Sequence, residues 1–220
     1  MNLKESIDNL YAAFSTYTIE GNLRDRCCNC CVSDEEIKQL LSKPLKEISE
    51  DDIYHFMTSA TTTFGDVNDY KHFLPRILEL MKDSENILDD FLTFEKLNYN
   101  NWKKWDIHEI KALINYFETS LINALDRDLE SINDFILLNL EYNEFDKLSN
   151  ILTKSNSKNF IREIIEGEIN GYFHKVDDQL LKLYSSKEIL TKIENLFFET
   201  KDKDLANRIS IAYSLLEFRS

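Results

Sequence analysis

The sequence predicts an all-α protein. Apolar residues recur at helical spacing along almost all of its 220 residues, whereas the alternation of apolar and polar residues that is typical of strands is scarce. Only four Gly and two Pro occur, so few positions favour a tight turn or a broken helix. We therefore expect about ten helices, joined by short polar loops and packed as an antiparallel helical bundle or with α-solenoid-like packing.

The first predicted helices have recognisable start and stop signals. An amphipathic helix near the N-terminus is followed by an irregular stretch, Thr18–Val32, that contains every cysteine. Ser33 and Glu36 have the spacing of a capping box, and Pro44 ends the helix that they open. Ser49 caps a third helix, whose acidic first turn suits the positive end of the helix dipole. The apolar faces of these helices are Leu3, Ile7, Leu10, Tyr11 and Phe14; Ile37, Leu40 and Leu41; and Ile53, Phe56, Met57 and Ala60.

The next segment, Thr61–Asp83, combines a turn with a strongly periodic helix. Gly65 and Asp66 form the turn, and Pro75 is expected to kink the helix or to start a new one. Ser84 can cap a further helix. The apolar stripes of the two helices are Tyr70, Phe73, Leu74, Ile77, Leu78 and Met81, and then Ile87, Leu88, Phe91 and Leu92.

The rest of the chain starts with a loop, Leu97–Trp105, and is otherwise helical. Asp106 and Glu109 resemble a cap pair before the longest periodic run, and Gly171 is expected to stop a later helix. No linker or low-complexity segment divides the chain, so we predict one domain, 1–220, with a soft boundary near 97–105. The periodic residues include Ile110, Leu113, Ile114, Phe117, Leu121, Ile122 and Leu125; Leu129, Ile132, Ile136 and Leu140; Phe145, Leu148 and Leu152; Phe160, Ile161, Ile164, Ile165 and Ile169; and Leu205, Ile209, Ala212, Tyr213 and Leu216.

The charge of the chain indicates the kind of partner it favours. The formal net charge is −14, from 40 acidic and 26 basic residues. Such a field repels phosphate backbones and anionic membranes, so neither a nucleic acid nor a membrane is an expected partner. It favours a basic protein partner, or else serves only to keep the protein soluble. The N-terminus lacks an apolar signal-peptide core and no run approaches the length of a membrane span, so we expect a cytoplasmic protein.

All the cysteines, Cys27, Cys28, Cys30 and Cys31, lie in one short stretch and form two interleaved CxxC pairs. A structural zinc ion takes four tetrahedral ligands, usually two from each of two separated elements, so a single turn can rarely supply all of them. The chain has no second cysteine pair, so a histidine would have to complete the shell, and the candidates are His55, His72, His108 and His174. We assign the four cysteines and His72 as a candidate zinc site.

Two other interpretations of the cysteines remain open. Arg24, Arg26 and the helix that begins after Ser33 are placed to lower the pKa of a thiol, which favours redox or nucleophilic chemistry, although no base is identifiable. In the other interpretation the protein binds no cofactor and the cysteines pack into the interior as small hydrophobic residues. Thiols stay reduced in the cytoplasm, so a structural disulfide is not expected.

A second candidate cluster follows the cysteines. Asp69 and His72 lie one helical turn apart and can present a carboxylate and an imidazole together, as a metal site or an acid–base pair. The structural alternative is that Asp66 or Asn68 caps the helix, Asp69 interacts with its dipole and His72 lies at the helix flank. Arg76 is a candidate ion-pair partner for one of these acids.

The order of these features resembles an uncharacterised family of bacterial helical proteins. The features that carry the resemblance are the cysteine-dense turn and the segments VSDEEIKQLLSKPLKEIS and FGDVNDYKHFLPRILEL, and the likeness covers roughly residues 1–80. It implies no activity. It does favour a common location in space for the cysteines, Asp66, Asp69, His72 and Arg76.

No motif in the chain indicates an enzyme, since GxGxxG, P-loop, HExxH and GxSxG patterns are all missing from the sequence. We therefore expect a non-enzymatic protein that binds another protein. The most specific form of this hypothesis is an immunity- or antitoxin-like protein that neutralises a basic toxin through an acidic face. The alternatives are a metal- or thiol-dependent protein that uses Cys27–Cys31 and a helical-repeat scaffold. The sequence does not define the oligomeric state.

Overall fold

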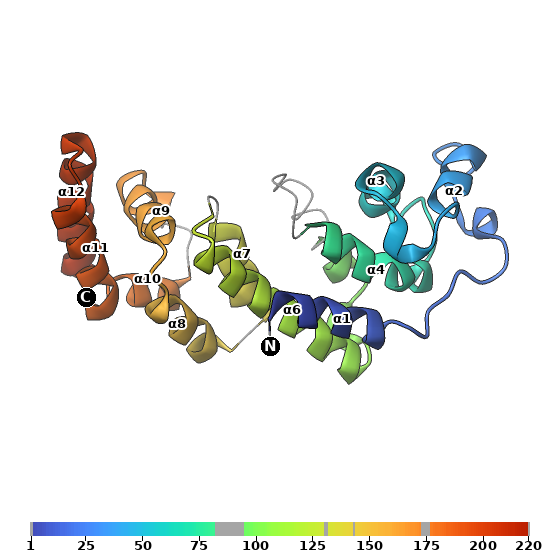
Figure 1. Cartoon of the computed structure of the whole chain (residues 1–220), viewed down its shortest axis with the longest axis horizontal. Helices are drawn as coiled ribbons and strands as arrows, with labels where there is room; N and C mark the ends of the chain where they lie inside the picture. Colours follow the sequence, from blue (N-terminus) through green and yellow to red (C-terminus); the bar gives the residue numbers. More distant parts are fainter. Residues whose placement is uncertain (1, 82–94, 130–131, 143, 173–176, 220) are drawn as a thin grey trace. The chain divides into compact units, whose positions relative to one another are not determined.

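The computed structural model is all-α, which confirms the predicted fold class (Figure 1). It describes residues 2–81, 95–129, 132–142, 144–172 and 177–219, so the helix predicted after Ser84 lies outside the described residues. Within these ranges the only β pairings are two isolated bridges, Cys27–Phe64 and Ala60–Phe64. The chain forms two compact units, Met1–Thr119 and Ser120–Ser220.

The first unit contains both candidate clusters, namely the cysteines and the group of Asp66, Asp69, His72 and Arg76. Its helices, including the short 3-10 helices labelled η, are α1 (Leu3–Ala13), η1 (Leu23–Arg26), α2 (Asp34–Leu40), η2 (Leu45–Glu47), α3 (Glu50–Ser59), α4 (Val67–Met81), η3 (Trp102–Lys104) and the first part of α6 (Ile107–Asp126).

Side-chain caps begin the first three α-helices of this unit. Complete capping boxes join Asn2 to Glu5 at α1, Ser33 to Glu36 at α2, and Ser49 to Asp52 at α3. Each box satisfies two backbone N–H groups that have no partner within their own helix. The helix starts predicted at Ser33 and Ser49 are thereby confirmed.

Helix α4 forms the centre of the first unit. Its predicted apolar stripe is buried, and α1 and α3 pack against it. The ring of Phe56 on α3 lies 4.6 Å from that of Phe73 and 5.2 Å from that of Phe64, measured between ring centroids. The helix runs through Pro75 without ending, so Pro75 does not start a new helix. Burial of each large apolar side chain here contributes about 2 kcal/mol to stability.

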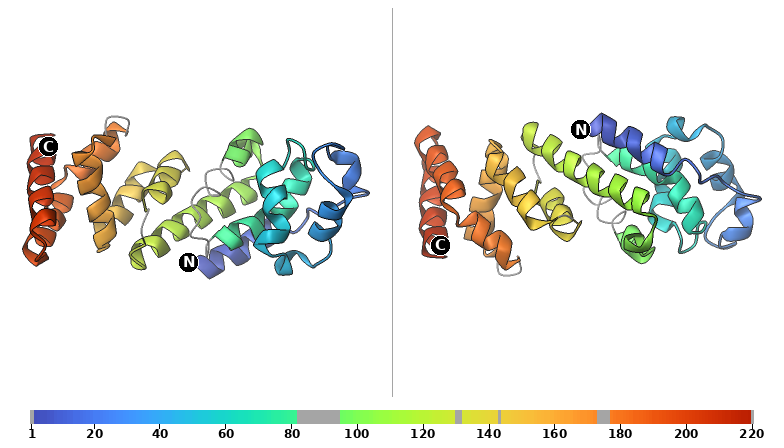
Figure 2. Two further views of the ribbon diagram at one scale, coloured as in Figure 1. Left: turned by 90° about the horizontal axis from the view of Figure 1, so that it is seen from above. Right: turned by 90° about the horizontal axis from the view of Figure 1, so that it is seen from below.

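The second unit has its own core. Besides the end of α6 it consists of α7 (Ile132–Tyr142), α8 (Phe145–Lys154), α9 (Lys158–Ile169), α10 (Asp178–Tyr184), α11 (Lys187–Glu199) and α12 (Lys203–Arg219). Helix α12 packs against both α9 and α11 (Figure 2). The buried core includes Leu148, Leu152, Phe160, Ile161, Ile164, Ile165, Leu180, Tyr184, Ile189, Ile193, Ile209, Ala212 and Leu216.

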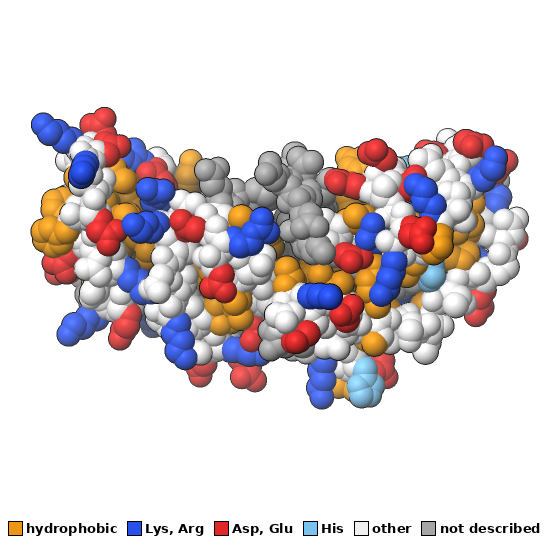
Figure 3. Space-filling view, in the orientation of Figure 1, with side chains coloured by type: hydrophobic (Ala, Val, Ile, Leu, Met, Phe, Trp, Pro, Cys, Tyr) orange, Lys and Arg blue, Asp and Glu red, His pale blue; other side chains and the backbone are white. Residues whose placement is uncertain are grey.

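The surface carries acidic and basic side chains and some exposed aromatic residues. On the face drawn in Figure 3, acidic and basic side chains are interspersed in each unit rather than gathered by sign. The largest exposed apolar side chains of the second unit include Phe198, which is 75% exposed, and Phe218, which is 93% exposed. No described helix has both the length and the apolar character needed to cross a membrane.

Candidate metal centre

The cysteines lie on a tight turn between η1 and α2. The backbone N–H of Cys28 donates to the carbonyl of Thr63 at 2.8 Å, which ties the turn to the segment that follows α3. The turn closes on itself, because the N–H groups of Cys31 and Val32 both donate to the Cys28 carbonyl, at 3.2 Å and 3.1 Å. The capping box of Ser33 then starts α2 directly after the turn. The turn is therefore held by backbone hydrogen bonds on both sides.

This backbone brings three thiols together. The Sγ atom of Cys28 lies 3.1 Å from that of Cys30 and 3.2 Å from that of Cys31, and the last two are 3.6 Å apart. A tetrahedral zinc ion with Zn–S bonds of about 2.3 Å holds its sulfur ligands about 3.8 Å apart. Small side-chain adjustments therefore suffice to place one ion among the three sulfur atoms. Cys30 and Cys31 are exposed, so packing into the interior does not account for their positions.

Cys27 does not belong to this group. Its Sγ lies 3.2 Å from the Leu23 carbonyl oxygen and donates to it, and its backbone pairs with Phe64 in the isolated bridge. Burial raises the pKa of the Cys27 thiol. A half-buried, protonated thiol of this kind acts as a small packing group. The interior-packing interpretation thus describes Cys27, while the other three cysteines form the cluster.

The thiols of the cluster have different acidities. Hydrogen bonding with Cys30 and Cys31 lowers the pKa of Cys28 to about 7, because it stabilises the Cys28 thiolate. The same arrangement raises the pKa of Cys31 to about 12, because its proton is held against the Cys28 thiolate. One thiolate therefore forms near neutral pH in the metal-free cluster, and the thiolate is the form that binds metals.

His72 lies apart from the thiol cluster. Its Nδ1 is 2.8 Å from the carbonyl oxygen of Tyr17, and its ring packs edge-on against Phe73. In the part of the chain that the structure describes, the only group of three or more potential metal ligands within 4.8 Å of one another is Cys28, Cys30 and Cys31. The structure thus assembles three of the five predicted ligands and places Cys27 and His72 elsewhere.

The acidic residues of the second predicted cluster stabilise the start of α4. Oδ1 of Asp66 accepts the backbone N–H groups of Asn68 and Asp69 at 2.8 Å and 3.1 Å, and Oδ2 of Asp69 accepts the N–H of Asp66 at 2.9 Å. Gly65 precedes them with a φ of +72°, and a Cβ at that position would lie 2.9 Å from the Asp69 carboxylate. This geometry requires glycine.

Arg26 is the partner of Asp69. Its Nε and Nη2 donate to the two carboxylate oxygens at 2.7 Å each, and its Nε lies 3.5 Å from Asp66. Arg76, which the sequence suggested for this role, instead donates to the Ile48 carbonyl and to Glu79, both at 2.7 Å. The Asp69 hydrogen bonds raise the pKa of Arg26, so the guanidinium stays charged. This pair links the residue before the cysteine turn to the start of α4.

A buried polar network was missed by sequence reasoning. Lys71 on α4 and Glu109 on α6 form an ion pair at 2.8 Å, and both side chains are at least 90% buried. The hydroxyl of Tyr17 donates to Glu109 at 2.5 Å and accepts from Lys71 at 2.9 Å, and the Lys71 ammonium lies 4.4 Å from the centre of the Trp105 ring. Every member has a partner, so the network holds the segment before η1 against two helices. A lysine inside an otherwise apolar stripe is the signal that could have indicated it.

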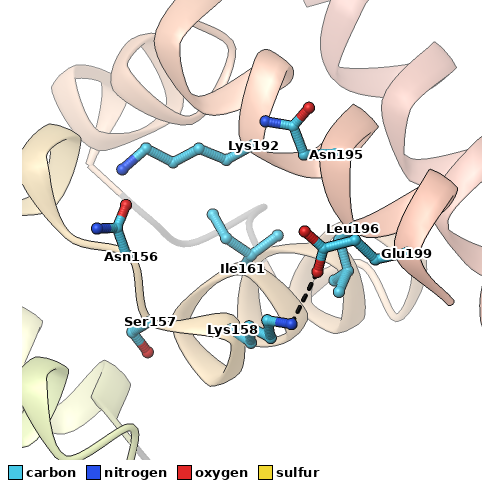
Figure 4. Close-up of a pocket in the computed structure, with 8 residues that line it drawn as sticks. All are labelled: Asn156, Ser157, Lys158, Ile161, Lys192, Asn195, Leu196 and Glu199. Atoms are coloured by element: carbon cyan, nitrogen blue, oxygen red, sulfur yellow. Dashed lines mark hydrogen bonds and ion pairs between the residues drawn. The ribbon is translucent and has the colours of Figure 1, made fainter.

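The structure has a cleft in each unit. One, of about 250 Å³ in the first unit, is lined by polar side chains that include Tyr17, Glu20, Arg26 and Asp66. The other, of about 270 Å³ in the second unit, lies between α9, α11 and the loop before α9 (Figure 4). In it Lys192 donates to the Ser155 carbonyl, and Lys158 pairs with Glu199 at 2.7 Å. The charged side chains of this second cleft are thus engaged within the chain.

Comparison with known proteins adds no further constraint on function. No protein-family model, no curated protein and no solved structure matches the chain.

Proposed function

We propose that this chain binds one soft metal ion, zinc in the first instance, through the thiolates of Cys28, Cys30 and Cys31. The observation that carries the proposal is the convergence of three Sγ atoms at separations of 3.1 to 3.6 Å on a turn fixed by backbone hydrogen bonds. Thiolate ligands favour zinc and copper(I) over hard cations such as magnesium and calcium. The cytoplasmic location expected from the sequence is part of this proposal, because the thiols must stay reduced to bind the ion.

Metal content of the purified protein tests this function. The full chain is prepared with a non-thiol reductant, and zinc is measured together with the number of reactive thiols. We expect about one equivalent of zinc per chain and protection of three thiols. Cys28→Ser, Cys30→Ser and Cys31→Ser should each lose most of the metal, whereas Cys27→Ser is the matched control and should keep it. Less than about 0.1 equivalent in the reduced, zinc-exposed protein would refute the proposal.

The same preparation separates metal binding from thiol–disulfide chemistry. The Sγ atoms of Cys28 and Cys31 lie 3.2 Å apart, which also suits a CxxC redox pair. A redox role predicts a Cys28–Cys31 disulfide that forms reversibly with glutathione disulfide as the oxidant. A metal role predicts that bound zinc prevents that disulfide, because both sulfur atoms are then coordinated.

A protein-binding role is the second candidate function. It is favoured by the net charge of −14 and by the exposed Phe198 and Phe218 side chains. In its most specific form the chain, as a bacterial immunity- or antitoxin-like protein, neutralises a basic toxin. Large exposed aromatic side chains are typical anchors at protein interfaces, and the negative charge would speed association with a basic partner.

Affinity capture from cells of the source organism tests the second candidate. We expect one basic protein at stoichiometric amounts, lost at high salt and in the Phe198→Ala, Phe218→Ala double variant. The matched control replaces Tyr54, an exposed aromatic residue on α3 in the first unit, with alanine. Recovery of no protein, or of acidic proteins only, would contradict this role.

A further inference from the structure

We infer that the metal bound at this turn has three thiolate ligands from the chain and a fourth coordination position open to an exchangeable neutral donor. This inference rests on the proposed metal binding and adds the coordination number and the class of the missing ligand. Zinc with three protein ligands and an open fourth position exchanges that ligand with solvent or with a donor group from another molecule. A closed four-cysteine site does not.

Cys27 is held away from the position of a fourth ligand. Its thiol is bonded to the Leu23 carbonyl oxygen at 3.2 Å, and its backbone is fixed by the bridge to Phe64. Bringing this sulfur into the cluster would break its hydrogen bond to Leu23. Three of the four neighbouring cysteines therefore remain as ligands.

The imidazole and carboxylate side chains of the described residues do not join the thiol cluster. Nδ1 of His55 lies 2.8 Å from Glu36, and Nδ1 of His72 lies 2.8 Å from the Tyr17 carbonyl oxygen. Asp34, the first residue of α2, accepts from Arg24 at 2.7 Å. In the described ranges, no imidazole or carboxylate belongs to the group of ligand atoms within 4.8 Å of one another.

Access and charge decide which class of ligand fits the fourth position. Cys30 and Cys31 are exposed, so the side of the cluster away from the backbone faces solvent. Three thiolates around a divalent zinc ion leave a net charge of about −1, and a fourth thiolate would make it about −2. The chain already carries a net charge of −14, which disfavours a further anion. Water or the imidazole of another molecule is therefore the ligand class that fits.

Cobalt substitution of the full-length protein tests the coordination number. The cobalt(II) complex should have the thiolate-to-cobalt absorption of three sulfur ligands, and added imidazole should shift its d–d bands saturably at constant metal content. X-ray absorption of the zinc form should give three sulfur atoms and one nitrogen or oxygen atom. Cys27→Ser should leave both results unchanged, and a thermal melt checks that this variant is folded.

Several outcomes would overturn the inference while leaving metal binding intact. A four-sulfur signature that is insensitive to imidazole and becomes three-sulfur in Cys27→Ser would show that Cys27 turns into the site. Half an equivalent of metal per chain in a dimer would show that two chains share the ion. Failure to bind any metal is a separate result, and it would refute the proposed function as well.

Discussion

At the scale of single residues, Cys28 is the most reactive thiol expected in the metal-free chain. Hydrogen bonding with Cys30 and Cys31 lowers the pKa of Cys28 to about 7. At pH 7 the Cys28 side chain is then a thiolate in about half of the molecules, compared with about 1% for a thiol with a pKa of 9. A thiolate with a lower pKa is also a weaker nucleophile. The alkylation rate of Cys28 at pH 7 is therefore only about sixfold higher than that of a thiol with a pKa of 9.

This acidity can be measured by alkylation with iodoacetamide at several pH values, followed by peptide mapping. Cys28 should react first, with a midpoint near pH 7, and the Cys30→Ser, Cys31→Ser double variant should move the midpoint upward and slow the reaction at pH 7 severalfold. Cys27→Ser is the control and should leave the Cys28 rate unchanged. Equal rates at Cys28 and Cys30 would contradict the hydrogen-bonded arrangement.

Asp52 is a second residue whose protonation matters. The Lys43 ammonium and the hydroxyl of Ser49 donate to its Oδ2 at 2.5 Å and 2.6 Å. These hydrogen bonds hold the pKa of Asp52 well below the usual range, and the bond from Lys43 has the larger effect. A carboxyl group with a lowered pKa stabilises the fold above its ordinary pKa, near 4, and this contribution is lost as the pH falls below that value.

We therefore expect Asp52→Asn to lower the melting temperature at pH 7 and to differ less and less from the parent protein as the pH is lowered below about 4. Thermal melts across this pH range provide the measurement. Asp51→Asn is the matched control, because Asp51 is an exposed neighbour in the same helical turn, and it should change little. A difference that grows on acidification would show that the hydrogen bonds do not depend on the charge.

At the scale of elements, the Arg26–Asp69 pair joins the cysteine turn to α4. The Asp69 side chain is 2% exposed and that of Arg26 is 25% exposed, so removal of the arginine leaves a carboxylate buried with only backbone donors. Breaking a buried ion pair from one side costs about 3 kcal/mol. By contrast, the Asp34 side chain that pairs with Arg24 is 87% exposed, and surface pairs contribute about 1 kcal/mol or less.

Urea denaturation should accordingly show that Arg26→Ala lowers the free energy of unfolding by about 3 kcal/mol. Arg24→Ala, the control from the same turn, should lower it by about 1 kcal/mol. Asp69→Asn together with Arg26→Met should recover part of the loss, because no charge is then left unpaired. If the two arginine variants lowered the free energy of unfolding equally, the Arg26–Asp69 pair would contribute no more to stability than the surface pair of Arg24.

The same elements show which features can be read from the sequence. The starts of α2 and α3 were predictable because a capping box is a local pattern, fixed by residues three positions apart. The partner of Asp69 was not predictable, because Arg26 lies 43 residues away and Arg76 had an equally plausible spacing on the helix itself. The cysteines were found as a cluster, but only the backbone path of the turn separates Cys27 from the other three.

At the scale of the whole molecule, two units with separate cores should respond differently to metal. Zinc bound to the folded form alone stabilises it by about 2.7 kcal/mol at a hundredfold excess over the dissociation constant. The cysteine turn contacts the Thr63–Gly65 segment through backbone hydrogen bonds, so this segment should share the effect. The core of the second unit consists of residues from Leu121 onward, and none of the three thiols belongs to it.

Hydrogen exchange with and without zinc measures this difference. Peptides that cover the cysteine turn and the start of α4 should exchange more slowly with zinc, and those from α9, α11 and α12 should be unchanged. Cys28→Ser should abolish the protection. A uniform change across both units would contradict a local effect and would require cooperative unfolding of the entire chain.

The position of all three proposed ligands within four consecutive residues has a consequence for the order of events in folding. Assembling ligands from so short a segment closes almost no loop, so little chain entropy opposes ion binding before the surrounding helices exist. If the metal binds as proposed, a nascent chain can therefore take it up as soon as this turn has left the ribosome. Since the unfolded chain then competes for the ion as well, the thermodynamic gain on folding is smaller than for a site whose ligands come from distant helices.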